Sequence, residues 1–224
     1  MDFDYLNAGG PRLSVGALDI ETGKFTNFDN AQITIGPDHI MASGALPPGF
    51  PPVEMGGRYY WDGGLVSNTP LQHVMESAST DPLLIFQIDL FSARGPLPEN
   101  LNAVAQRQKD MQYSSRTRLT TDRFKHLQDL RAAAERLRDK LPDELKQDPD
   151  LVTLCASGVA CGVTLVHLIQ RKERFETQTK DYEFSRLTML QHWAAGVEDV
   201  ETTLAHPRWQ ARSTEALGAC RYSI

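Results

Sequence analysis

The feature that most constrains this 224-residue chain is an almost unbroken apolar run over residues 83–91, L-L-I-F-Q-I-D-L-F. Such a run, without alternation, is typical of a strand in a parallel sheet that is covered on both faces. That strand needs neighbouring strands and helices over each face. We therefore expect an α/β fold in which either the helical part of the chain covers this strand, or some of the sheet lies outside the 224 residues.

The sequence before this run predicts short strands, turns and short helices. Two hairpins are expected around the turn signals E-T-G-K and G-G, with strands at residues 12–20, 24–28, 53–55 and 58–61. Short helices are expected over residues 37–45 and 69–77, because a proline lies in the first turn of each. The first part of the chain is therefore predicted to be mixed α/β.

The second half of the chain is predicted to be mainly helical. Helices are expected over residues 115–141 and 181–204, and a short strand over residues 163–169. Residues 151–155 are also predicted to form a buried strand. The first helix carries apolar residues at three- and four-residue spacing, which we expect to dock on the α/β part: Leu119, Phe124, Leu127, Leu130, Ala134, Leu137 and Leu141.

Charge separates the same two parts of the chain. Residues 1–106 carry a net charge of −8 and residues 107–147 one of +4. Gly95, Pro96 and Pro98 favour a turn or linker just before residue 99, so we expect domains at 1–98 and 99–224. The basic segment has two interpretations: attraction to anionic lipid, or a solvated helix face with i,i+4 ion pairs. The second is favoured because the apolar stripe is needed for docking.

Composition excludes several classes of protein. A net charge of −6 argues against nucleic-acid binding, and three cysteines without paired spacing argue against a disulfide scaffold or a metal site. The first residues show no secretory signal, so we expect a cytoplasmic protein. Residues 151–170 lack charged side chains, but Gly158 and Gly162 interrupt them, so buried strands are favoured over a membrane-spanning helix.

The sharpest candidate site is the tripeptide Asp62-Gly63-Gly64, which follows a predicted strand. A carboxylate at a strand end can point into a cleft and accept a proton, and the glycines allow positive φ angles and a close backbone approach. Asp-Gly is also one of the commonest turn dipeptides, so these three residues alone predict only a turn.

The surrounding sequence carries a resemblance. H-I-M-A-S-G-A-L-P-P-G-F-P-P-V at 39–53 precedes Y-Y-W-D-G-G-L-V-S-N-T-P at 59–70. This combination resembles the patatin-like phospholipase family, in which an A-S-x-A-x-P-x-x-F-P-P block precedes D-G-[GA]. H-L-I-Q-R-K at 167–172 and K-D-Y-E-F-S-R at 180–186 resemble the C-terminal extension of a bacterial branch. The resemblance implies the C-terminal part of a three-layer α/β/α fold over residues 1–98, followed by a mainly helical extension with a short strand over 99–224.

The resemblance also implies a mechanism. In the family, the serine of G-x-S-x-G attacks the ester carbonyl, the aspartate of D-G-[GA] is the base, and a glycine-rich loop forms the oxyanion hole. Asp62 takes the role of base, supported by Gly63 and Gly64. Neither G-x-S-x-G nor G-x-G-x-x-G occurs in this chain, and the family carries both N-terminal to the blocks present here. We therefore expect no nucleophile in this chain and no ester hydrolysis by it alone.

Other candidate residues are assigned structural roles. Ser14, Ser43 and Ser67 lack the glycine pattern of a nucleophile turn, although Ser43 stays open as a substitute. His39 and His73 are expected to pack or face solvent, because the implied dyad needs no histidine. The expected substrate is a lipid or another ester, with no cofactor, no metal and compatibility with peripheral membrane contact. The sequence does not define the oligomeric state. The alternative is a non-catalytic lipid- or partner-binding module.

Overall fold

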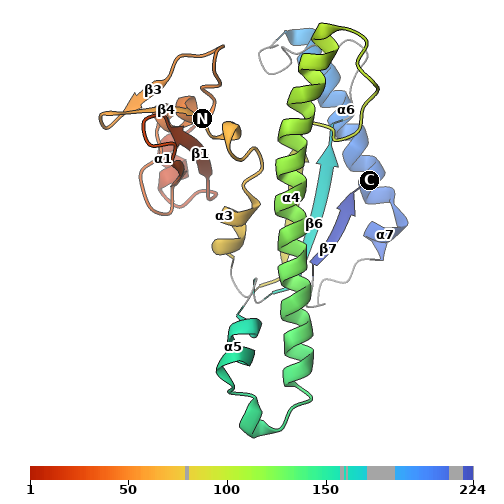
Figure 1. The fold of residues 1–224 in the computed structure, drawn as a ribbon. Helices are drawn as coiled ribbons and strands as arrows, with labels where there is room; N and C mark the ends of the chain where they lie inside the picture. The colour runs from red at the N-terminus through yellow and green to blue at the C-terminus, as the bar shows by residue number, and fades with distance from the viewer. Residues whose placement is uncertain (79–80, 157–158, 160, 171–184, 212–218, 224) are drawn as a thin grey trace. The chain divides into compact units, whose positions relative to one another are not determined.

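The computed structural model describes residues 1–78, 81–156, 159, 161–170, 185–211 and 219–223. The chain divides into two compact units, Met1–Pro70 and Leu71–Ile224, each with one sheet (Figure 1). Helices and sheets occur together throughout, which confirms the predicted α/β class. The boundary between the two compact units falls after Pro70. The domain boundary predicted from the sequence, between residues 98 and 99, stays a prediction.

The first unit is a small antiparallel sheet with two short helices. Its strand order is β2-β1-β4-β3, and both hairpins and the helix after Gly36 are confirmed. The elements are α1 (Phe3–Asn7), β1 (Ser14–Asp19), β2 (Phe25–Asp29), α2 (Pro37–Ser43), β3 (Val53–Met55) and β4 (Arg58–Asp62).

A small core joins α2 to this sheet. Ala17 and Ala42 are fully buried, and Tyr60 is nearly so. The ring of Phe28 makes edge contacts with Tyr60 and His39, at centroid distances of 5.5 Å and 4.9 Å. Because alanine lies where α2 crosses β1, the helix backbone can approach the strand closely.

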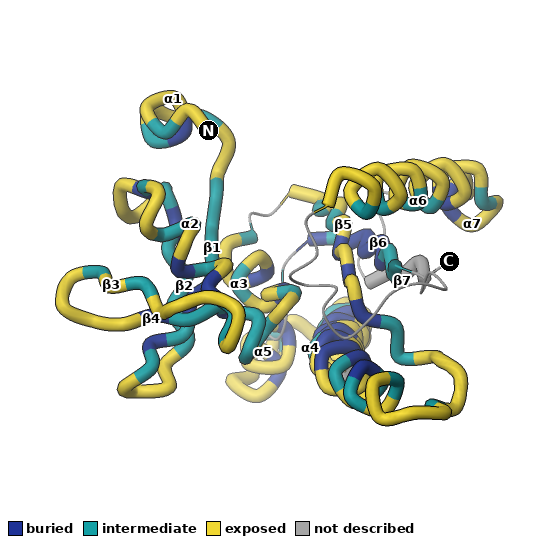
Figure 2. Tube along the Cα trace, turned by 90° about the horizontal axis from the view of Figure 1, so that it is seen from above, coloured by how far each residue is buried: buried dark blue, intermediate teal, exposed yellow. Residues whose placement is uncertain are grey.

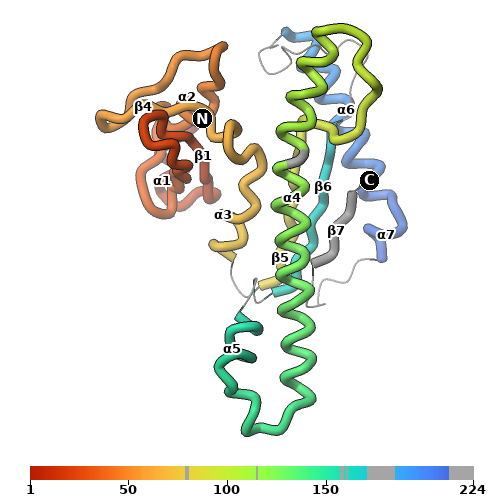
Figure 3. Tube along the Cα trace, in the orientation of Figure 1, coloured from red at the N-terminus to blue at the C-terminus, as the bar shows by residue number. Residues whose placement is uncertain are grey.

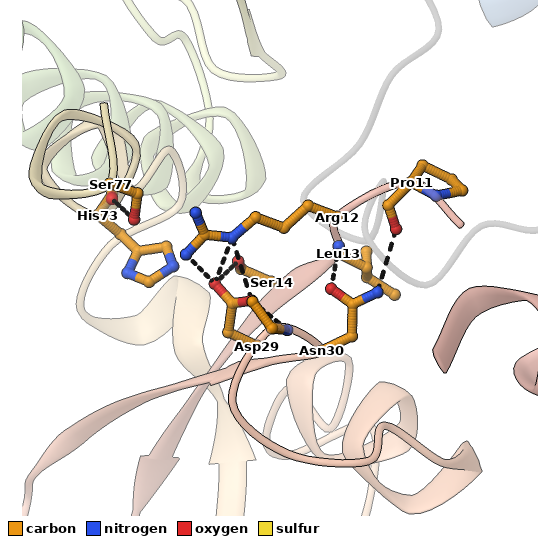
Figure 4. Close-up of polar contacts among 9 residues, drawn as sticks. Pro11, Arg12, Leu13, Ser14, Asp29, Asn30, His73 and Ser77 are labelled. Atoms are coloured by element: carbon orange, nitrogen blue, oxygen red, sulfur yellow. Dashed lines mark hydrogen bonds and ion pairs between the residues drawn. The ribbon is translucent and has the colours of Figure 1, made fainter. Parts of the chain in front are cut away.

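Two buried aspartates tie the strand ends together. The Asp29 carboxylate accepts hydrogen bonds from Arg12 Nη2 and Ser14 Oγ, both at 2.7 Å (Figure 4), and raises the pKa of Arg12. Asp19 accepts bonds from the Thr22 N–H at 3.0 Å and from Arg58 Nη1 at 2.9 Å. One carboxylate therefore closes the β1–β2 turn and also holds the start of β4.

The second unit is built on a three-stranded parallel sheet in the order β5-β6-β7. Figure 2 shows the long helix α4 and helix α6 on opposite sides of this sheet. The elements are α3 (Leu71–Glu76), β5 (Leu83–Asp89), α4 (Leu101–Arg138), α5 (Pro149–Cys155), β6 (Val163–Ile169), α6 (Arg186–Ala205), α7 (Pro207–Gln210) and β7 (Ala219–Ser223). The described residues also include the 3₁₀ turns η1 (Gly63–Leu65) in the first unit and η2 (Asp143–Leu145) in the second.

Strand β5 is the predicted parallel strand, and in the described part of the chain its two faces are unequally buried, although Phe86 on the more exposed face contacts the Trp209 ring of α7. Gln87 and Asp89 are buried on the face towards α4, whereas Leu84, Phe86 and Ile88 alternate with them and are 45–63% exposed. The two alternatives expected from the sequence, cover by the helical part of the chain or further sheet outside the 224 residues, therefore both stay predictions. An apolar run identifies a strand, but its neighbours in space decide which face is buried.

Helix α4 docks on the sheet through polar side chains. Leu119 is 72% exposed and Leu130 and Leu137 are about half exposed, so the predicted docking stripe is wrong apart from Phe124 and Ala134. The buried face carries Gln106, Asp110, Ser114, Thr117, Thr121 and Gln128. Short hydroxyl side chains tolerate burial because they donate to carbonyls one turn earlier, as Thr121 does to Thr117 at 2.8 Å, and the Thr121 hydroxyl oxygen also lies 3.1 Å from Gln87 Oε1.

Residues 151–155 belong to helix α5, which corrects their prediction as a strand. Asp148 caps this helix by accepting from the N–H groups of Asp150 and Leu151, and Pro149 occupies its first turn. α5 packs against the C-terminal half of α4 (Figure 3) through Leu151, Cys155 and Ala134. None of the helices in the described part of the chain is long and apolar enough to cross a bilayer.

The Asp19 contacts predict a specific acid dependence of stability. The Thr22 N–H, and after it Arg58, lower the pKa of Asp19 although burial opposes them. A lowered pKa means that this stabilisation is fully present above the unfolded value of about 3.9 and is lost as the pH falls through the folded value. Asp19→Asn should therefore lower the free energy of unfolding at pH 7, and the difference from wild type should shrink at pH 3 and below in urea titrations. Glu21→Gln, at an exposed neighbouring position, is the control and should change neither the free energy of unfolding at pH 7 nor its dependence on pH. Equal effects of the two substitutions on stability would contradict this account.

Candidate functional site around Asp62

Asp62 is positioned by three segments of the first unit. It is the last residue of β4, it lies opposite Ala17 of β1, and its backbone N–H donates to Ala45 O at 3.1 Å. Ala45 comes from the upstream block at 39–53, and Val53 of the same block is the register partner of Tyr60. The two sequence blocks that carry the family resemblance therefore contact each other beside the candidate base.

The Asp62 side chain is oriented by the turn that follows it. Its Oδ1 atom accepts a hydrogen bond from the Gly64 N–H at 2.7 Å, which caps the 3₁₀ turn η1. The residue is only partly buried. This short bond to a charged acceptor orients the carboxylate, and partial exposure leaves the group within reach of a second molecule.

The motif glycines are needed for close approach and not for positive φ angles. A Cβ atom on Gly63 would lie 2.5 Å from Gly16 O and 2.9 Å from the Phe25 ring. A Cβ on Gly64 would lie 3.0 Å from Asp62 Oδ1 and 3.2 Å from Asn68 Oδ1. Positive φ angles occur only at glycines elsewhere among the described residues, Gly9, Gly23, Gly56 and Gly57. The sequence suggested two reasons for glycine at positions 63 and 64, a positive φ angle or a close backbone approach, and the structure supports the second.

The other candidate residues have structural contacts. Ser14 donates to Asp29 at 2.7 Å, and the Ser67 N–H donates to Gly63 O at 2.9 Å within η1. His39 Nδ1 accepts from the Gly36 N–H at 3.0 Å and so caps α2. Ser43 is the last residue of α2, and His73 lies on α3 in the second unit. The packing role expected for His39 is confirmed.

A metal cluster and a reactive thiol are two further kinds of group that the described residues could provide. No cluster of three or more histidine, cysteine or carboxylate side chains suited to a metal ion occurs among the described residues. Burial raises the pKa of the Cys161 thiol, which keeps it in its less nucleophilic protonated form. The geometry around Asp62 can therefore orient a base, and a base needs a hydroxyl to act on.

Two contributors were not identifiable from the sequence. The carbonyls of Gly16 and Ala45 contact the Asp62-Gly63 turn, yet they lie 46 and 17 positions before it. Only the strand register β1–β4 brings Gly16 there. Asn68 was part of the sequence motif, and its side-chain oxygen does lie beside Gly64.

Two family models match this chain. One, described as patatin-like phospholipase, matches residues 22–75 and includes Asp62 and both sequence blocks. The other, described as patatin phospholipase, matches residues 111–216, from within α4 to beyond α7. The search of curated proteins found no match. Both models describe patatin phospholipases, so the chain belongs to the patatin-like phospholipase family, which at family level is one of lipid acyl hydrolases.

The close approach at Gly63 predicts a steric test. Gly63→Ala should lower the free energy of unfolding by about 1–3 kcal/mol, because the new methyl group meets the Gly16 backbone carbonyl, which cannot rotate away. Denaturant titration measures this. Gly44→Ala, also in the first unit, places its methyl 3.7 Å from the nearest atom and should change stability little. A tolerated Gly63→Ala would contradict the close packing of η1 on β1.

Proposed function

We propose that this chain supplies the aspartate base of a serine–aspartate dyad for lipid ester hydrolysis, with Asp62 in that role. The observation that supports it most is the 2.7 Å bond from the Gly64 N–H to Asp62 Oδ1, formed within the segment that matches the family model. That bond holds a partly exposed carboxylate in one orientation at the end of β4. A fixed orientation suits proton abstraction from a serine hydroxyl.

In this proposal, the nucleophile and the oxyanion hole come from sequence other than these 224 residues. The chain contains neither G-x-S-x-G nor G-x-G-x-x-G, so residues 1–98 supply the base part and residues 99–224 the extension. A carboxylate without a hydroxyl to activate does not perform acyl transfer. The 224-residue chain alone therefore does not hydrolyse esters.

The base role predicts the effect of one substitution in an active form that includes the family's serine segment. Asp62→Asn should lower kcat for a p-nitrophenyl ester by about 10²–10⁴-fold, because an amide cannot accept the proton. The fold should be retained, since the amide oxygen can still accept the Gly64 N–H bond. The measurements are initial rates and an unfolding titration.

Two comparisons make the Asp62 test decisive. Asp62→Ala also removes the cap, so it should lower both turnover and stability, whereas Asp62→Asn lowers turnover alone. Near-normal turnover of Asp62→Asn would overturn the dyad assignment. Hydrolysis by the unaltered 224-residue chain at the rate of the longer form would overturn the claim that the nucleophile lies elsewhere.

A groove in the second unit favours a second function, lipid binding without catalysis. It has a volume of about 590 Å³ and lies between α3 and α4. Most of its lining is apolar (Leu71, Met75, Leu119, Phe124, Leu127 and Val159), and Gln72, Glu76, Thr120 and Arg123 are its polar residues. The apolar side chains fit an acyl chain, and Glu76 and Arg123 are the charged groups beside it. The exposed α4 face thereby favours the lipid interpretation of the basic segment, alongside the i,i+4 ion pair Arg131–Glu135 that is also present.

The groove predicts selective lipid binding by the 224-residue chain. Co-sedimentation with phosphatidylglycerol vesicles should exceed that with phosphatidylcholine vesicles several-fold, because residues 107–147, which contribute the α4 side of the groove, carry a net charge of +4. Leu119→Asp, at a highly exposed groove position, should reduce binding by about tenfold. Leu137→Asp, exposed on the same helix but outside the groove, is the matched control and should leave binding unchanged. Equal loss in both variants, or no preference for anionic vesicles, would remove this candidate.

A further inference from the structure

Helix α6 presents its apolar side to solvent. Five apolar residues follow one another at spacings of three and four, so they share one face of the helix, and each is 36–73% exposed: Leu190, Trp193, Val197, Val200 and Leu204. We call these five residues the α6 stripe. Trp193, the largest of them, is also the most exposed.

The opposite face of α6 is the one that packs. Thr203 is the only buried residue of this helix, and the more sheltered positions Ala195 and Asp199 lie on the same side as Thr203. An amphipathic helix in a folded domain ordinarily directs its apolar face inwards. α6 does the reverse, so its stripe is not used by the described part of this chain.

The spacing within the stripe is that of a two-stranded helical pair. Positions 190, 197 and 204 correspond to heptad position a, and positions 193 and 200 to position d. The flanking positions 194 and 196 hold Ala194 and Gly196. A Cβ on Gly196 would meet no atom within 4 Å, although glycine inside a helix costs about 1 kcal/mol relative to alanine. Packing within the chain does not require this glycine, whereas a second helix passing beside Trp193 would use the space.

We propose that α6 pairs with α6 of a second copy of this chain in an antiparallel coiled coil centred near Ala195. In this register Trp193 packs on Val197 of the second copy, and Leu190 packs on Val200 of the second copy. Gly196 then faces its own equivalent, and so does Ala194, which leaves room for the two indole rings. The antiparallel direction also sets the two helix dipoles in opposition.

Charge complementarity fixes the direction and argues for this occupant. In the antiparallel register, Arg186 at the start of one helix lies opposite Leu204 of the other and within one turn of Glu201, so its guanidinium can form an ion pair with Glu201 at each end of the seam. In a parallel pair, Glu201 would instead face Gly196 of the second copy. A membrane surface fits less well, because the polar side of α6 carries Glu198 and Asp199, whereas helices that lie on bilayers carry lysine and arginine there.

The first test is the oligomeric state of the full chain by sedimentation equilibrium over a range of concentrations. We expect a monomer–dimer equilibrium, and Trp193→Asp should weaken it by at least about tenfold. Thr202→Asp, at an exposed position outside the α6 stripe, is the matched control and should leave the equilibrium unchanged. Circular dichroism should be the same for all three proteins. A wild-type chain that is monomeric throughout, or a dimer insensitive to Trp193→Asp, would overturn the proposal.

The second test addresses direction and register. Gly196→Cys should give a disulfide-linked dimer on mild oxidation, because the two positions face each other, whereas Glu198→Cys and the wild-type chain should not. Arg186→Glu and Glu201→Arg should each weaken the dimer, and the double variant should restore it. Failure of the Gly196→Cys cross-link, or of the double reversal to restore the dimer, would overturn the antiparallel register.

Discussion

The close approach of η1 to β1 is the constraint on which the arrangement around Asp62 depends. Gly63 lies so near Gly16 O that any side chain would separate the two segments. Asp62 is register partner to Ala17, the residue after Gly16, so moving η1 would also disturb the end of β4. The Gly64 N–H that holds Asp62 Oδ1 belongs to the same turn. One backbone contact therefore sets both the position and the orientation of the carboxylate. The contact is possible because glycine has no Cβ atom.

Three aspartates organise the first unit in the same way. Asp19, Asp29 and Asp62 each end a strand and each accept a backbone N–H within two or three residues. A carboxylate at this position replaces the ladder partner that the backbone loses where the strand stops. Asp19 and Asp29 in addition bind Arg58 and Arg12, so they brace the sheet. The Asp62 motif is thus a capping device that this unit uses repeatedly, and what distinguishes it is its two glycines and its sequence context.

Much of the first unit could be predicted from the sequence, because its signals are local. Turn glycines mark both hairpins, and Pro37 marks the start of α2. The Gly16 contact could not be predicted, since it depends on which strand lies next to β4, and pairing between distant strands has no local signal. The same limit applies to α4: its leucines at helical spacing predict a docking face, but the structure buries threonine and glutamine, because Thr121 and Gln128 find partners on β5 and before β6. Asp62 as a proton-accepting candidate came from motif context, and the structure adds its orientation.

The second unit is where hydrophobic patterning and burial disagree, in three separate elements. β5 exposes Leu84, Phe86 and Ile88, α4 exposes Leu119 and Leu130, and α6 exposes its whole stripe. Apolar rows of this size on solvent-facing elements mark contact surfaces, because a soluble domain gains nothing by leaving them uncovered. Strand β5 contains no lysine or proline, the residues that commonly prevent an edge strand from pairing with another chain. Its composition therefore favours an edge that is covered. Asp62 lies in the other compact unit, so a substitution in the α6 stripe removes none of the hydrogen bonds that orient the carboxylate. Both copies of the 224-residue chain lack G-x-S-x-G, so pairing through α6 does not by itself complete the dyad, and the α6 stripe and the Asp62 site can be tested independently.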